Sequence, residues 1–135
     1  MATTLTPQQM KEFIRNHFED FVNNRKADVI RQNMTPDFYD HNGPGNKPAD
    51  IKGDEEMMVG MYKALPDLRL TIEHLVAEGD RVVCQNVWRW KDHQTGKAME
   101  FHGFVMWRLE GDRIAERWAT VTAPAEDHGG PWQRK

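Results

Sequence analysis

The spacing of apolar residues changes near Asp67, from a helical period to a strand period. Before this point, apolar side chains recur every three or four residues. After it they alternate with polar ones, as in Leu68, Leu70 and Ile72. Helices followed by strands are typical of an α+β domain, in which the helices cover one face of an antiparallel sheet. A chain of 135 residues is long enough for one such domain and its core.

Three helices are predicted in the first half of the chain. The first begins after an N-cap and a first-turn proline, Thr6 and Pro7, and extends to about Asn24. A short second helix is expected over residues 27–33, and a third over residues 53–65.

Four long strands are predicted in the second half, paired as two hairpins. The first hairpin pairs the strand that begins at Asp67 with residues 81–90, and the second pairs residues 99–109 with 113–122. Such a sheet tends to curl, and helices across its mouth then enclose a conical pocket. We therefore predict a cone-shaped α+β barrel, in which the N-terminal helices pack across the concave face of a curved antiparallel sheet.

The chain is expected to form one domain over residues 1–122, followed by a polar, mobile tail over residues 123–135 that contains Trp132. A loop over residues 42–48, rich in Gly and Pro, is long enough to lie over the mouth of a pocket.

The composition limits the partners and the compartment. The net charge is −3, from 18 basic and 21 acidic residues, which argues against binding to nucleic acid. The single cysteine, Cys84, cannot form an internal disulfide, and the N-terminus lacks the apolar block of a signal peptide. No apolar run reaches the length of about 20 residues needed to cross a bilayer. We expect a cytoplasmic protein that binds neither nucleic acid nor membranes.

Two neighbouring strands carry ionisable and apolar residues on one face. These residues are Glu100, His102, Phe104 and Met106 on the first strand, and Ile114, Glu116, Trp118 and Thr120 on the second. If these faces point into the pocket, apolar neighbours raise the pKa of Glu116 toward the range of a general base or acid, with His102 nearby. Alternatively, Glu116 pairs with Arg113 or Arg117 on an exposed face, and His102 is a hydrogen-bonded sheet residue.

A second candidate pair, Asp40 and His41, precedes the Gly/Pro loop, at a point where the backbone can turn a side chain inward. The alternative is that Asp40 only caps backbone N–H groups. The candidate apolar lining of the pocket consists of Trp88, Trp90, Phe104, Met106 and Trp118.

Motifs for other chemistries are lacking. The six histidines are scattered, and no sequence typical of a metal, phosphate-loop, dinucleotide or serine-hydrolase site is found. We therefore expect no dedicated metal site.

Several short runs occur in a familiar order. They are Phe38-Tyr39-Asp40-His41-Asn42, Leu65-Pro66-Asp67-Leu68, Glu78-Gly79-Asp80-Arg81-Val82, Phe101-His102-Gly103, and Gly111-Asp112-Arg113-Ile114 with Glu116-Arg117-Trp118. Together they resemble the SnoaL-like polyketide cyclase family of the nuclear transport factor 2-like superfamily. The resemblance extends from the first helix to Thr122.

This resemblance implies a cone-shaped α+β barrel that forms a homodimer through its outer sheet face. It also implies, for some members, ring closure of a polyketide ester by intramolecular aldol condensation without a metal or organic cofactor. His102 and Glu116 resemble the catalytic histidine and carboxylate of such cyclases, which carry Asp where this chain has Glu116. Thr122 stands where many members have Asp.

Three functions are compatible with the sequence. The first is a cofactor-independent lyase or isomerase acting on a small apolar carbonyl compound. In it Glu116 is the base, His102 orients it or protonates the product, His41 lies at the pocket rim and Asp40 is the alternative carboxylate. The second is a non-catalytic protein that binds a small hydrophobic ligand. The third uses the sheet surface, and here a homodimer is expected to cover an apolar outer face that carries Phe101, Val105, Trp107 and Leu109.

Overall fold

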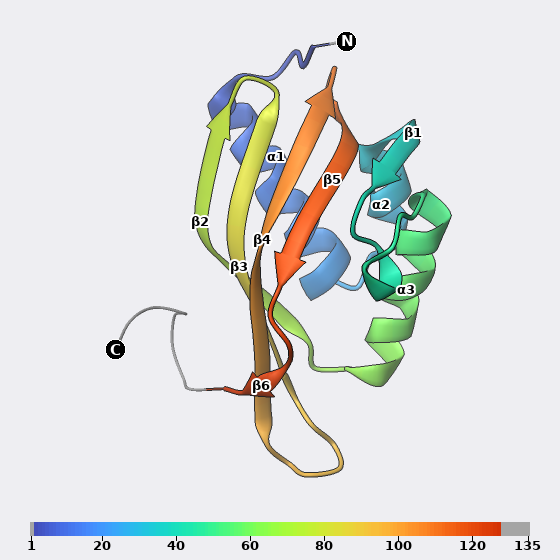
Figure 1. The fold of residues 1–135 in the computed structure, drawn as a ribbon, viewed down its shortest axis with the longest axis vertical. Coiled ribbons are helices and arrows are strands. Elements are labelled where there is room, and N and C mark those ends of the chain that lie inside the picture. Colours follow the sequence, from blue (N-terminus) through green and yellow to red (C-terminus); the bar gives the residue numbers. More distant parts are fainter. Residues whose placement is uncertain (1, 128–135) are drawn as a thin grey trace.

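The computed structural model describes residues 2–127 (Figure 1). The helices are α1 (Pro7–Phe18), the π-helix η1 (Glu19–Asn23), α2 (Asp28–Asn33), the 3₁₀ turn η2 (Pro44–Asn46) and α3 (Ile51–Ala64). The strands are β1 (Met34–Asp40), β2 (Arg69–Glu78), β3 (Arg81–Lys91), β4 (Ala98–Glu110), β5 (Arg113–Val121) and β6 (Ala125–Glu126).

Local capping sets where the longer helices begin. The Thr6 hydroxyl accepts a hydrogen bond from the Gln9 backbone N–H at 3.1 Å, and the Gln9 side chain accepts one from the Thr6 N–H at 2.9 Å. The expected helix to about Asn24 is confirmed in extent, because the π-helix η1 follows α1 directly and ends at Asn23. At α3, the Asp50 carboxylate accepts from the Gly53 N–H at 2.9 Å, so this helix begins slightly earlier than predicted.

Five strands form the main sheet in the order β1-β5-β4-β3-β2. Both predicted hairpins are confirmed, as β2 with β3 and β4 with β5. The sequence reading missed β1, which lies parallel to β5 at the sheet edge, so the sheet is mixed rather than antiparallel throughout, and it is not closed. Pro36 follows the end of α2 as expected but lies within β1, where an edge position tolerates a residue without an N–H group.

The helices lie on the concave side of the sheet, as predicted, and Figure 1 shows α1 crossing behind β3 and β4. The inner face of β4 carries Val105, Trp107 and Leu109, each at most 1% exposed, in one core with Ile14 and Phe18 of α1. The predicted class, an α+β cone with helices on its concave face, is therefore confirmed.

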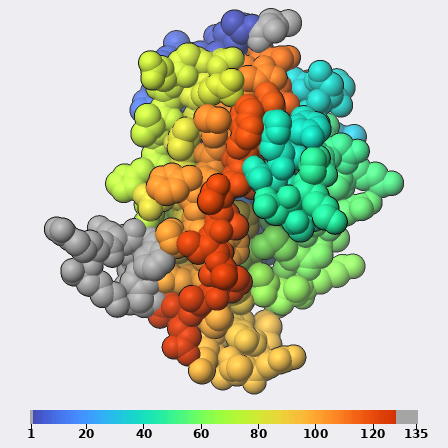
Figure 2. All heavy atoms as spheres, viewed as in Figure 1, coloured from blue at the N-terminus to red at the C-terminus, as the bar shows by residue number. Residues whose placement is uncertain are grey.

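The apolar residues that were expected to lie on the outer face of the sheet point inward instead. Val105, Trp107 and Leu109 belong to the core, and Phe101 packs against it. The reason given for a dimer was therefore wrong, because the helices of the same chain already cover this face. Dimerisation through the outer face stays a prediction, and Figure 2 shows that face, on which β5 lies beside the segment around β1.

The expected mobile tail begins with an ordered segment. In β6, Glu126 pairs with Met99 of β4, and Asp127 lies 3.3 Å from Arg89 in an ion pair. Trp132 lies outside the described residues. Within residues 2–127, no helix is both long and apolar enough to span a membrane.

Candidate active site

A cavity of about 500 Å³ lies between the concave face of the sheet and the helices. Its size suits a small organic ligand. Apolar side chains from α1, α3, β3 and β4 form most of the wall, including Phe18, Met57, Met58, Trp88 and Trp107. The polar lining includes His17, Asp40, Asn42, Asp54 and Arg117.

A bulge in β5 decides which of its residues reach this cavity. Arg108 of β4 pairs with Glu116, but the next residue, Leu109, pairs with Ile114, so β5 has one extra residue at Ala115. Because of this insertion, Ile114 and Glu116 do not share a face as the alternation predicted. Ile114 is in the core, whereas Glu116 pairs with side chains outside the cavity.

Asp40 and Arg117 are opposite each other on β1 and β5. Arg117 Nη1 donates to both carboxylate oxygens of Asp40 at 3.0 Å, and it also donates to the Asn42 carbonyl at 3.0 Å. The Asn42 N–H donates to Asp40 Oδ1 at 2.9 Å, as in the capping alternative considered from the sequence. Asp40 is fully buried and lines the cavity. Both alternatives considered for Asp40 therefore hold, because its side chain points inward and also accepts a hydrogen bond from a backbone N–H group.

Asp54 of α3 supplies a second carboxyl group beside Asp40. It is 5% exposed, and its Oδ1 atom has no hydrogen-bond partner among residues 2–127. Burial raises the pKa of Asp54 to about 8, and a hydrogen bond with Asp40 and the charge of Asp40 act in the same direction, while Arg117 opposes them. Asp54 is therefore largely protonated at neutral pH, in contact with a carboxylate that is paired with an arginine.

His17 of α1 lines the same cavity and is 1% exposed. Its ring meets the Trp107 ring edge-on, with 5.5 Å between centroids. Burial lowers the pKa of His17 to about 3, and the charge of Arg117 lowers it further, so the imidazole is neutral at physiological pH.

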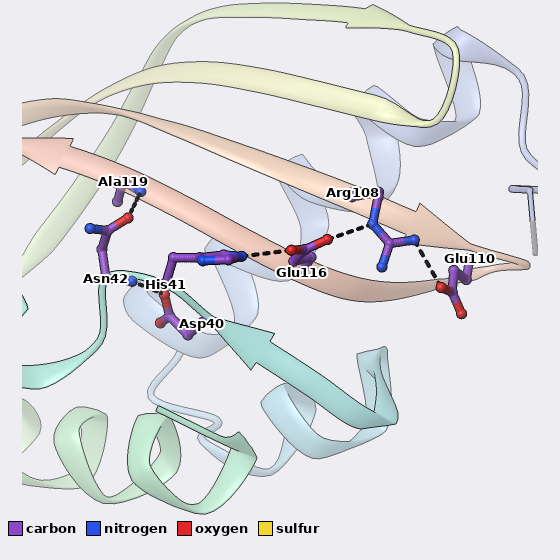
Figure 3. A network of polar contacts seen from close by, with 7 residues as sticks. All are labelled: Asp40, His41, Asn42, Arg108, Glu110, Glu116 and Ala119. Carbon is purple, nitrogen blue, oxygen red and sulfur yellow. Dashed lines mark hydrogen bonds and ion pairs between the residues drawn. The ribbon is translucent and has the colours of Figure 1, made fainter. Parts of the chain in front are cut away.

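The predicted base, Glu116, lies outside the cavity, in a network of hydrogen-bonded side chains along β4 and β5 (Figure 3). Its carboxylate lies 2.6 Å from His41 Nε2 and accepts from Arg108 Nε at 2.7 Å, while Arg108 Nη1 donates to Glu110 at 2.8 Å. The hydrogen bond from His41, followed by that from Arg108, lowers the pKa of Glu116, which is the opposite of the predicted shift. Glu116 thus pairs with a cation, as in the alternative reading, but that cation is Arg108.

Other predicted lining residues also lie outside the cavity. The His41 ring stacks on Trp118 at 4.7 Å, and Phe104, which is 54% exposed, lies on the same outer face as Met106. His102 pairs through its backbone with Thr122, at N···Oγ1 3.1 Å, and is not among the cavity residues. The catalytic roles assigned to Glu116 and His102 stay predictions.

The two tryptophans of β3 divide between different surroundings. Trp88 lines the cavity as predicted, whereas Trp90 packs on Phe101 at 5.8 Å and borders a shallow surface pocket with Arg69 and Lys91. The loop after β1 contributes Asn42 to Asn46 to the cavity wall, which agrees with the expectation of a loop over a site.

Three ionisable cavity residues, Asp54, His17 and Arg117, were missed from the sequence. Asp54 lies three and four positions before Met57 and Met58, and His17 lies three positions after Ile14. A titratable residue on the apolar stripe of a helix was therefore the available signal for both. Arg117 could not be assigned to the cavity without knowledge of the β5 bulge.

The site offers no evident metal centre. In the described part of the chain, no group of three or more His, Cys, Asp or Glu side chains is arranged to hold a metal ion. The polar groups of the cavity instead form a carboxyl pair, an arginine and a neutral imidazole.

The fold and site define an α+β cone whose apolar cavity holds a small cluster of acid and base groups. The model of the SnoaL-like polyketide cyclase family matches residues 12–122, and the chain belongs to this family.

Solved structures agree with this fold. IdmH of Streptomyces antibioticus, provisionally assigned as a polyketide cyclase, is 25% identical with a TM-score of 0.73, over 82% of this chain and 89% of that one. AclR of Streptomyces galilaeus, provisionally assigned as a hydroxylase, is 20% identical with a TM-score of 0.77, over 86% of this chain and 80% of AclR. A SnoaL-like protein from Jannaschia sp. CCS1 is 19% identical with a TM-score of 0.73, over 85% of this chain and 86% of the Jannaschia protein. No curated protein matches the sequence.

Proposed function

We propose that the protein catalyses proton transfer and aldol-type ring closure on a small, apolar, uncharged carbonyl compound bound in the cavity, without a cofactor. The observation that carries this proposal is the buried carboxyl pair, in which Asp54 contacts Asp40 and Asp40 is paired with Arg117. A carboxyl group with a pKa near neutrality suits acid–base catalysis, because it can both accept and return a proton.

Asp54 is the proton carrier in this mechanism. Its ionised form takes a proton from the carbon next to a carbonyl, and the C–H electrons move into the enolate. The enolate carbon attacks a second carbonyl of the same molecule, which forms the new C–C bond and an alkoxide. The alkoxide then takes the proton back from Asp54, which restores the carboxylate.

Burial and the neighbouring Asp40 make Asp54 a stronger base than an ordinary carboxylate, because both disfavour its ionisation and raise its pKa. The charge of Arg117 opposes this shift, and Arg117 holds Asp40 in place through two hydrogen bonds. The apolar wall around them excludes water and favours an uncharged ligand.

Exchange of α-protons for deuterium, followed by NMR in D₂O, tests the first step without knowledge of the natural substrate. The probes are neutral aryl methyl ketones and β-keto esters. The protein should accelerate exchange above the buffer rate, and Asp54→Asn should abolish the acceleration. Glu56→Gln is the matched control, because Glu56 is an exposed carboxylate on the same helix.

The same assay separates the alternatives. Loss of exchange in Glu116→Gln with full exchange in Asp54→Asn would return the catalytic role to Glu116. Saturable ketone binding with exchange at the buffer rate would reject the enzyme and favour a protein that only binds a hydrophobic ligand.

A further inference from the structure

His17 has one ring nitrogen with a partner and one without. The Nδ1 atom lies 2.9 Å from the side-chain nitrogen of Asn33, at the end of α2. The Nε2 atom is buried and has no hydrogen-bond partner among the residues that the structure describes. The side chain is 1% exposed and lines the cavity.

The contact with Asn33 determines which nitrogen carries the proton. An amide nitrogen can only donate, so His17 Nδ1 must accept in this contact. A neutral imidazole has one N–H group, and the proton therefore resides on Nε2. Because the buried ring stays neutral, Nε2 offers a hydrogen bond without a positive charge.

A buried donor without a partner is unfavourable, because it loses its hydrogen bond to water and gains none in the protein. Such a donor in a cavity wall is explained if the ligand supplies the missing acceptor. The rings of Phe21 and Trp107 pack on His17, at 4.7 and 5.5 Å between centroids. Because no residue among 2–127 accepts a hydrogen bond from Nε2, a ligand in the cavity is the source that we consider for an oxygen atom.

We infer that His17 is a ligand-binding residue, whose Nε2–H donates a hydrogen bond to a carbonyl or enolate oxygen of an uncharged substrate, and that Asn33 positions it by holding its tautomer. The inference deepens the proposed function and rests on it for the identity of the ligand as a carbonyl compound. It adds a fixed donor on α1 to the proton carrier Asp54 on α3. A neutral donor stabilises the negative charge that develops on oxygen when the α-proton leaves.

A matched pair of probes tests this contact. 2-Acetonaphthone carries a carbonyl oxygen, and 2-isopropenylnaphthalene has the same shape with a CH₂ group in its place. A neutral hydrogen bond predicts that the wild-type protein binds the ketone about five-fold more tightly than the hydrocarbon. Equal affinities, or failure of the ketone to bind, would overturn the inference.

Nitrogen NMR of histidine-labelled protein provides a readout that does not need a variant. The His17 Nδ1 resonance should be that of an unprotonated nitrogen and Nε2 that of an N–H group, with the Nε2 proton moving downfield on addition of the ketone but not of the hydrocarbon. A proton on Nδ1, or an Nε2 proton resonance that does not shift when the ketone is added, would contradict the assigned tautomer and contact of His17.

Substitutions then connect the donor to the preference. His17→Phe keeps an aromatic ring beside Phe21 and Trp107 and should remove the five-fold preference, while His17→Gln, which restores an N–H donor, should recover part of it. His93→Phe, at an exposed turn position, should leave the preference unchanged. A preference that persists in His17→Phe would refute the contact.

Failure of this inference is distinguishable from failure of the proposed function. Asp54→Asn should abolish α-proton exchange and still prefer the ketone. If the wild-type protein prefers the ketone through His17 but does not accelerate exchange, the binding contact holds and the catalytic proposal fails.

Discussion

Arg117 and Asp40 join the middle of β5 to the end of β1 through two hydrogen bonds of 3.0 Å from one guanidinium nitrogen. The two residues are direct neighbours in the parallel pairing of these strands. The pair places a buried negative charge against Asp54 and so connects the sheet edge to the proton carrier on α3.

The raised pKa of Asp54 predicts a pH dependence of stability. The folded state holds the Asp54 proton up to about pH 8, whereas the unfolded chain loses it near pH 3.8. The stabilisation is therefore complete below pH 3.8 and is lost as the pH rises through 8. Burial, Asp40 and Asp50 raise the pKa of Asp54, and the charge of Arg117 lowers it. Relative to Asp54→Asn, the wild-type free energy of unfolding should fall by at least about 2 kcal/mol between pH 4 and 8. Urea titrations at both pH values measure it, and parallel curves for the two proteins would contradict the shift.

The same group predicts a pH profile for proton exchange. If ionised Asp54 is the base, the exchange rate per mole of bound ketone should rise about ten-fold per pH unit below the pKa and level off above pH 8. A bound-state rate that instead levels off near pH 4 to 5 would indicate an ordinary carboxylate as the base. Initial rates of deuterium incorporation at saturating ketone give this profile.

Removal of one member of the Asp40–Arg117 pair should be costly. Asp40→Asn leaves the cation of Arg117, whose side chain is 15% exposed, without its carboxylate, and should destabilise the protein by about 3 kcal/mol. The double variant with Arg117→Met should regain much of this stability, because no charge is then left unpaired. Denaturation of the single and double variants measures the coupling, and simple additivity of the two losses would argue against it.

We predict that the outer face of the sheet binds a second copy of this chain. Phe104 is 54% exposed there, and the family resemblance implies a dimer through this face. Phe104→Glu should convert a wild-type dimer into a folded monomer, since a buried unpaired charge at an interface is unfavourable. Sedimentation equilibrium reports both masses. A wild-type chain that stays monomeric at all concentrations would disprove the dimer.

The sequence alone determined the features that depend on neighbours along the chain. The capping box of Thr6 and Gln9, the three helices and the two hairpins of the long strands follow from short-range spacing, so the α+β class was predictable although β1 was missed. Asp40 also came out as a candidate, because it sits between an aromatic pair and the Gly/Pro loop.

Only the tertiary structure decided which side chains meet in the cavity. The strand that pairs in parallel with β1 lies more than seventy residues away in the sequence. One extra residue at Ala115 reverses which side chains of β5 face the cavity, so that Arg117 rather than Glu116 points inward. Strand alternation has a period of two, and a single bulge therefore shifts every later side chain to the opposite face. The contact of Asp54 with Asp40 joins a helix to a strand edge, and the burial that raises the pKa of Asp54 exists only once both have packed.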